Sequence, residues 1–137
     1  MAAYSLIAKH AAAGLAISAG LILSACVTTP KGPVASAFSA TAQSGVRVAL
    51  SGHVDVNRRC RSVGTPKVRI VQEPANGTTS ISKGSLRASA PGCNGKRVGG
   101  LIVFYQSNAG FKGQDQVKVE QILKDKIEEV TITINVK

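Results

Sequence analysis

The chain is poor in the side chains on which most enzyme and metal sites depend. Its 137 residues include seven acidic residues, two histidines, three cysteines, one methionine and no tryptophan. The acidic residues form no spaced pair suited to general acid–base catalysis. His53 is the only histidine after residue 25, and the Ser51-Gly52-His53 run lacks the context of a nucleophile elbow. We therefore predict that the protein is not an enzyme, that His53 is a half-exposed strand residue, and that no metal or cofactor is bound.

Long apolar segments are also lacking. The uncharged run from Ala11 to Ala25 is shorter than the roughly 20 residues of a membrane-spanning helix. It follows Lys9 and His10 and ends in small residues, which is the pattern of a cleaved secretory signal peptide. An uncleaved membrane anchor and an ordinary secretory cleavage site beside an incidental cysteine remain as alternatives.

The last four residues of this segment are Leu23-Ser24-Ala25-Cys26, and they resemble the bacterial lipobox. The resemblance implies cleavage before Cys26, lipidation of its sulfur and membrane anchoring through acyl chains. Val27 stands where an aspartate tends to retain enteric lipoproteins in the inner membrane, so the resemblance favours the outer membrane, on its periplasmic face or at the cell surface. The Pro- and Gly-bearing stretch that follows is typical of a flexible tether. We therefore predict a signal peptide over residues 1–25, a lipidated N-terminus and linker over 26–44, and one folded domain over 45–137.

The composition of this domain favours strands, since aromatic residues are few and Val, Thr, Ile, Gly and Ser are abundant. Period-two runs indicate about seven short strands, which favours a single all-β, immunoglobulin-like β-sandwich. Leu101–Tyr105 reads as a central strand and Gln116–Glu129 as a hairpin. The Asn76-Gly77 turn predicts that Thr78–Ser82 returns antiparallel to the Lys67–Glu73 strand, and Ser85–Ala90 reads as a separate short strand.

Several turns in the second half resemble those of bacterial cadherin-like and immunoglobulin-like repeats. The similar motifs are Glu73-Pro74-Ala75-Asn76-Gly77-Thr78, Val103-Phe104-Tyr105 and the loop Asn108-Ala109-Gly110-Phe111-Lys112-Gly113-Gln114-Asp115, followed by a closing strand Val130–Val136. The resemblance implies a β-sandwich and no particular activity. Phe111 is expected to plug one end of the core, and Asp115 to cap amides of its own loop. Calcium is not expected, because this loop supplies one carboxylate between two lysines and calcium takes 6–8 oxygen ligands.

The three cysteines divide into one for lipid and one pair. With Cys26 lipidated, Cys60 and Cys93 remain, and an even remainder in an exported chain predicts a disulfide. Closing a loop of about 34 residues stabilises a domain by on the order of 3–4 kcal/mol.

Positive charge is the feature present in excess. Lys and Arg total 17 against seven acidic residues, and the formal net charge is +10. A Cys60–Cys93 bond is expected to gather five cations into a candidate anion-binding patch at one end of the sandwich, remote from the C-terminal hairpin: Arg58, Arg59, Arg61, Lys96 and Arg97. Such a cluster attracts anions, although a solvated basic face explains the same residues.

These observations predict a lipid-anchored, non-catalytic binding or structural module of the outer membrane, such as an accessory subunit of a secretion or adhesion assembly. The alternative is a receptor for an anionic envelope polymer such as lipopolysaccharide or acidic polysaccharide. Nucleic acid is not expected as a partner, because no set of aromatic side chains for base stacking accompanies the charges.

Overall fold

The structure is a computed structural model that describes residues 32–123 and 126–137. The predicted signal peptide and Cys26 lie outside these residues. The described part contains seven β-strands and no helix, and therefore no helix able to cross a membrane. The strands are β1 (Val34–Ala42), β2 (Arg47–His53), β3 (Lys67–Gln72), β4 (Gly77–Arg87), β5 (Arg97–Ser107), β6 (Gly113–Ile122) and β7 (Ile127–Val136).

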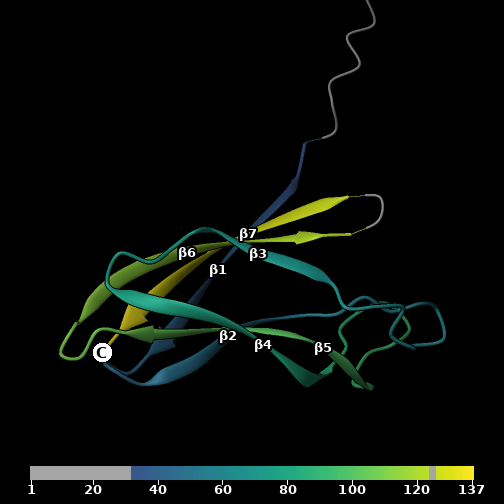
Figure 1. Cartoon of the computed structure of the whole chain (residues 1–137), viewed down its shortest axis with the longest axis horizontal. Coiled ribbons are helices and arrows are strands. Elements are labelled where there is room, and N and C mark those ends of the chain that lie inside the picture. Colours follow the sequence, from purple (N-terminus) through teal and green to yellow (C-terminus); the bar gives the residue numbers. More distant parts are fainter. Residues whose placement is uncertain (1–31, 124–125) are drawn as a thin grey trace, which may run out of the picture. The chain divides into compact units, whose positions relative to one another are not determined.

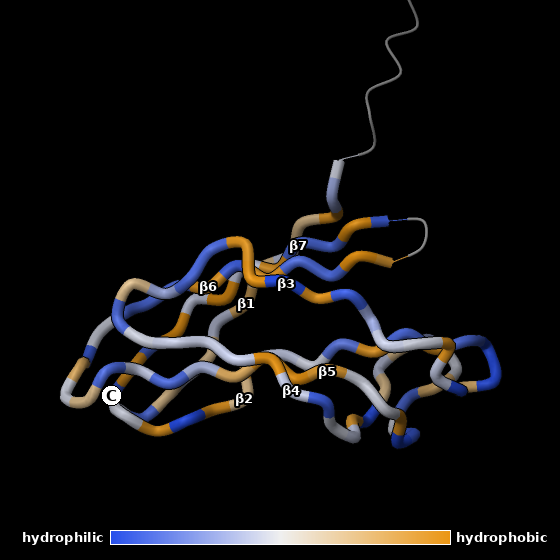
Figure 2. The backbone as a smooth tube through the Cα atoms, in the orientation of Figure 1, coloured by the Kyte–Doolittle hydropathy of each residue, from blue (hydrophilic) through white to orange (hydrophobic). Residues whose placement is uncertain are grey.

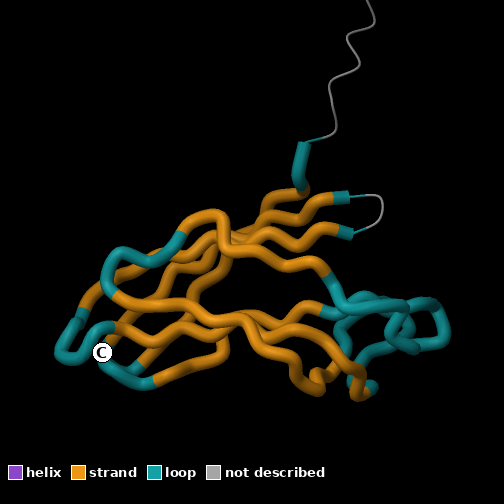
Figure 3. The backbone as a smooth tube through the Cα atoms, in the orientation of Figure 1, coloured by secondary structure: helices purple, strands orange, loops and turns teal. Residues whose placement is uncertain are grey.

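The strands form two sheets that face each other (Figures 1 and 3). One sheet has the order β1-β7-β6-β3 and the other the order β2-β5-β4. β1 runs parallel to β7, and the other neighbours are antiparallel. The predicted all-β class, strand number and sandwich-like arrangement are confirmed.

The core lies between the two sheets and follows the period-two pattern of the sequence. Figure 2 shows hydrophobic and hydrophilic residues alternating along the strands. Val103 and Tyr105 of β5 are fully buried against inward-facing residues of the opposite sheet, among them Val117, Ile132 and Ile134. Phe111 packs against this cluster as predicted.

Two local expectations are confirmed. Leu101–Tyr105 belongs to β5, the middle strand of the three-stranded sheet, which explains its nearly continuous apolar character. Gln116–Glu129 spans the antiparallel pair β6 and β7, in which Gln116 lies opposite Thr133 and Ile122 opposite Ile127.

The linker prediction was wrong for residues 34–42, which form β1. This strand pairs with β7 from Val34 opposite Glu128 to Ala42 opposite Val136. Its residues are mostly small and exposed, so the sequence carries no strong hydrophobic alternation. Backbone pairing with the free edge of β7 makes the strand, and a pattern search over side chains does not detect that.

The predicted β3–β4 hairpin was also wrong. β3 pairs with β6 in one sheet, whereas β4 pairs with β5 in the other. The connection after Gln72 therefore crosses between sheets instead of turning back within one. Ser85–Ala90 is likewise not a separate strand, because β4 continues without interruption to Arg87.

Candidate anion-binding site

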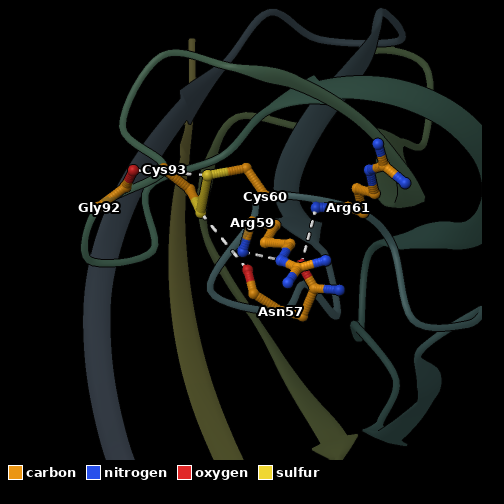
Figure 4. Close-up of a disulfide and its surroundings, with 6 residues drawn as sticks. All are labelled: Asn57, Arg59, Cys60, Arg61, Gly92 and Cys93. Atoms are coloured by element: carbon orange, nitrogen blue, oxygen red, sulfur yellow. Dashed lines mark hydrogen bonds between the residues drawn. A yellow bond between two sulfur atoms is a disulfide. The ribbon is translucent and has the colours of Figure 1, made fainter.

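Two loops at one end of the molecule are joined by the Cys60–Cys93 disulfide, which confirms the predicted pairing (Figure 4). We call residues 54–66 and 88–96 the stapled loops. The Cα atoms of the two cysteines lie 5.3 Å apart. Cys93 is buried with Ala88 and Val98, and Val54 packs against them, so the loops have a small hydrophobic core of their own.

Asn57 shapes the first stapled loop. Its Oδ1 accepts hydrogen bonds from the backbone N–H groups of Arg59 at 2.9 Å and Arg61 at 3.1 Å. The backbone closes the same turn, since Cys60 N–H donates to the Asn57 carbonyl and Asn57 N–H to that of Arg61. Cys60 has φ +60°, a left-handed conformation that side chains other than glycine seldom adopt. Figure 4 shows the turn beside the disulfide. Its dashed lines from sulfur to carbonyl oxygen mark contacts, because a disulfide sulfur carries no proton.

The second stapled loop folds back through two tight turns. Cys93 N–H donates to the Ala90 carbonyl at 2.9 Å, and Lys96 N–H to the Cys93 carbonyl at 3.1 Å. Gly92 and Gly95 have φ of +76° and +80°, which glycine adopts without steric cost. The second turn bonds the backbone of Lys96 to that of Cys93, and Arg97 begins β5.

All five predicted cations are exposed and belong to the stapled loops or to the strand that leaves them. The ion pairs among the described residues join Arg69 to Glu120, Lys118 to Glu129 and Lys126 to Glu128, so none involves the five. We call Arg58, Arg59, Arg61, Lys96 and Arg97 the basic cluster. Its binding role stays a prediction.

The C-terminal hairpin approaches the second stapled loop, although no residue of the basic cluster lines the cavity that they share. Leu123 and Lys126, at the tip of the hairpin, line an open cavity of about 480 Å³ together with Ala90 and Pro91 of the second stapled loop. The ends of β6 and β7 next to this cavity therefore lie close to the second stapled loop.

His53 is not half-exposed, as predicted, but 4% exposed. Its Nδ1 lies 2.9 Å from Gln121 Oε1 and its Nε2 lies 2.9 Å from Ser51 Oγ. Since an amide oxygen only accepts, Nδ1 donates to Gln121, and in the neutral imidazole Nε2 then accepts from the Ser51 hydroxyl. A hydroxyl–imidazole–acceptor chain is the geometry of serine hydrolases. Here these hydrogen bonds join β2 to β6 across the two sheets and give both nitrogens of a buried imidazole a hydrogen-bond partner.

Asp115 caps a different segment from the one predicted. Its Oδ1 accepts from Ala75 N–H at 2.8 Å and its Oδ2 from Asn76 N–H at 2.9 Å, both in the connection between β3 and β4. Tyr105 donates its hydroxyl proton to Oδ2 at 3.0 Å. Burial of the phenol, followed by its hydrogen bond to the Asp115 carboxylate and the charge of that carboxylate, raises the pKa of Tyr105.

Sequence reasoning missed three residues near the basic cluster. Asn57 could have been found as an Asx-turn residue, since Asn commonly bonds to backbone N–H groups two residues ahead. Lys83 and Arg87 could not, because only the register of β4 against β5 shows which residues they accompany. In that register Arg87 lies directly opposite Arg97.

Comparison with known proteins adds little. No family model matches the chain, and no curated protein matches it. Among solved structures, the solution structure of Amebosin is similar with a TM-score of 0.38 and 11% identity, over 77% of this chain and 98% of that one. A likeness of this size carries no conclusion about fold or function. The described residues contain no group of three or more His, Cys, Asp or Glu side chains arranged to hold a metal ion.

Proposed function

We propose that this chain is a lipid-anchored, non-catalytic module of the bacterial outer membrane that binds an anionic envelope polymer through its basic cluster. The observation that carries the proposal is that four exposed cations lie on two loops joined by one disulfide and a fifth, Arg97, begins the strand that leaves them, while the ion pairs of the described residues involve other side chains. The anchor rests on the lipobox-like sequence that ends at Cys26.

Collective charge is what makes such a surface useful. A single exposed ion pair contributes roughly 0–1 kcal/mol, but several cations together raise the local concentration of an anionic partner and speed its association. The disulfide limits how far the loops can separate. An acidic polysaccharide or lipopolysaccharide can contact several of these cations at once.

The proposal includes the family of β-sandwich to which the two sheets belong. We infer an immunoglobulin-like sandwich, supported by strand order: β2-β5-β4 corresponds to strands B, E and D, and β7-β6-β3 to strands G, F and C. β1 then corresponds to a first strand that pairs with the last. Loops at the ends of such sandwiches are the parts that immunoglobulin-like domains use for binding.

The proposal is tested with the chain from residue 26 carrying Cys26→Ser, which contains all seven strands. Replacing Arg58 and Arg59 by Gln is expected to weaken binding to phosphate-rich lipopolysaccharide by about three- to thirtyfold. The matched control replaces Lys112 and Lys137, which lie outside the stapled loops. Affinity that is equal in both variants, or indifferent to salt between low and physiological ionic strength, contradicts the proposal.

Anchoring is tested separately in the full chain. Cys26→Ser is expected to leave the protein unprocessed or soluble, because the thiol that accepts the lipid is gone. Intact mass spectrometry of the membrane fraction measures the outcome. A mature membrane-bound protein without acyl chains contradicts the lipid anchor.

A second candidate is an accessory subunit that docks by strand addition. It is favoured by β1, which pairs with β7 on one side and exposes 52% of Val34 and 42% of Phe38. Backbone pairing with an extended segment gives such contacts their affinity. Docking through this edge is expected to change little with salt, which separates it from polymer binding.

A further inference from the structure

The inner face of the three-stranded sheet changes from apolar to basic along β4 and β5. Val103 and Tyr105 point from this face into the core. Side chains two residues apart on a strand share a face, and the register places Ile81 opposite Val103 and Lys83 opposite Leu101. The next pairs on that face are Ser85 with Gly99 and Arg87 with Arg97.

The start of this basic stretch borders an open cleft, and the rest continues from it along the same face. We call Lys83, Ser85, Arg87, Arg97 and Gly99 the β4–β5 groove. Lys83 and Gly99 line a cleft of about 360 Å³ whose other wall is formed by Ser62, Gly64 and Thr65 of the first stapled loop. A Cβ atom added to Gly99 meets nothing within 4 Å, so the floor between the cations is clear.

Gly100, next to Gly99 in β5, is glycine for a different reason. A Cβ atom there would lie 2.4 Å from the His53 carbonyl oxygen, so packing on the opposite face of the sheet requires glycine. Packing does not require glycine at position 99. The absence of a side chain there leaves room for a ligand, which is a functional reason for glycine at this position.

The cations of the groove are arranged without carboxylate partners among the described residues. Arg87 lies opposite Arg97, and like charges at directly opposite positions are destabilising. Arg97 Nε donates to Ser85 Oγ at 3.3 Å, while Arg87 Nη1 donates to the Gly95 carbonyl at 3.3 Å. Both acceptors are neutral, so the two positive charges remain uncompensated. An anion between them relieves the repulsion.

We propose that the β4–β5 groove seats successive acidic groups of a linear polysaccharide, an inference that rests on the proposed function and extends it beyond the stapled loops. Residues two apart on a strand are separated by about 7 Å, which places Lys83 and Arg87 about 13 Å apart along β4. A chain with acidic groups on neighbouring sugars contacts both ends while its sugar backbone passes over Ser85 and Gly99. A polymer chain enters such a cleft, whereas the flat surface of a bilayer does not.

Edge protection is the competing explanation. β4 is an edge strand of its sheet, and inward-pointing charges on an edge strand discourage association of sheet edges. The two explanations differ in what happens when the charges are removed. Edge protection predicts self-association of the variant, and ligand seating predicts loss of polymer binding by a monomer.

The experiment measures binding of a sulfated dextran oligosaccharide to the chain from residue 26 carrying Cys26→Ser. The groove variant combines Lys83→Gln and Arg87→Gln, and the control variant combines Lys112→Gln and Lys137→Gln. The groove variant is expected to stay monomeric by sedimentation and to bind about three- to thirtyfold more weakly than the control. The Gly99 amide resonance of the unmodified groove is expected to shift on titration with the oligosaccharide.

The outcomes separate the two proposals. Equal affinity of groove and control variants, with weaker binding by Arg58→Gln/Arg59→Gln, overturns the groove and leaves the stapled loops as the binding surface. If neither the groove variant nor Arg58→Gln/Arg59→Gln binds more weakly than the control, both the groove proposal and the proposed function are overturned. Self-association of the groove variant with unchanged affinity establishes edge protection instead. A Gly99 shift with anionic phospholipid vesicles in place of the oligosaccharide overturns the assignment to a polysaccharide.

Discussion

Asp115 is expected to be the polar residue on which stability depends most. It is 6% exposed, and its carboxylate accepts hydrogen bonds from Ala75, Asn76, Gln116 and the Tyr105 hydroxyl. Asp115→Ala leaves the two N–H groups of the β3–β4 connection and the buried hydroxyl without their acceptor. Since each such bond contributes about 1–1.5 kcal/mol, the free energy of unfolding is expected to fall by roughly 3–4.5 kcal/mol.

Urea unfolding and thermal melting measure this loss. For a domain of about 100 residues each kcal/mol lowers Tm by about 4–8 °C, so Asp115→Ala is expected to melt roughly 12–36 °C lower. Tyr105→Phe removes one of the bonds and is expected to cost about 1 kcal/mol. The control is Gln114→Ala at the neighbouring exposed position, which is expected to change stability by less than about 0.5 kcal/mol. An Asp115→Ala protein within 1 kcal/mol of wild type would refute the reasoning.

The remaining predictions concern other bonds that join distant segments. Folding raises the pKa of Tyr105 above its unfolded value of about 10. The stability that the protonated Tyr105 contributes is therefore complete below pH 10 and is lost as the pH rises further. Urea midpoints measured from neutral to alkaline pH are expected to show this decline in the wild type and not in Tyr105→Phe. Cys60→Ser/Cys93→Ser is expected to lower the free energy of unfolding by on the order of 3–4 kcal/mol and to weaken polymer binding, which melting and titration of the variant measure against the oxidised protein. Gln121→Leu is expected to lower the free energy of unfolding by about 1–3 kcal/mol, because it leaves the His53 Nδ1 proton without an acceptor, and Ser51→Ala is expected to lower it by less. Labelling of Ser51 by a fluorophosphonate reagent would contradict a purely structural role for the Ser51–His53–Gln121 hydrogen bonds.

The class of the fold and the covalent bond were predictable because their signals are local or can be counted. Period-two alternation in β6 and β7 reports which residues face a core, whatever the partner sheet is. The pairing of Cys60 with Cys93 followed from an even remainder of cysteines after Cys26 was assigned to lipid. The exposed cations of the basic cluster were visible as runs in the sequence for the same reason.

Strand partners were not predictable from such signals. Asn76-Gly77 has the composition of a hairpin turn, yet Asp115 binds the backbone just before it and the chain passes into the other sheet. Val34–Ala42 lacks an apolar pattern, and its strand exists because β7 offers a free edge of backbone donors and acceptors. His53 looked exposed since its partner, Gln121, lies 68 residues away.

The sequence by itself determined the all-β class, the Cys60–Cys93 disulfide and the excess of positive charge, because each depends on residue type and on spacing along the chain. Only the tertiary structure decided which cations stand together. Lys83 and Arg87 are separated from Arg97 by a turn and a stapled loop, and the register of β4 against β5 brings them to one face beside an open glycine floor. Register is a relation between strands, set by how two sheets bury their apolar faces, and no single segment of the chain contains it.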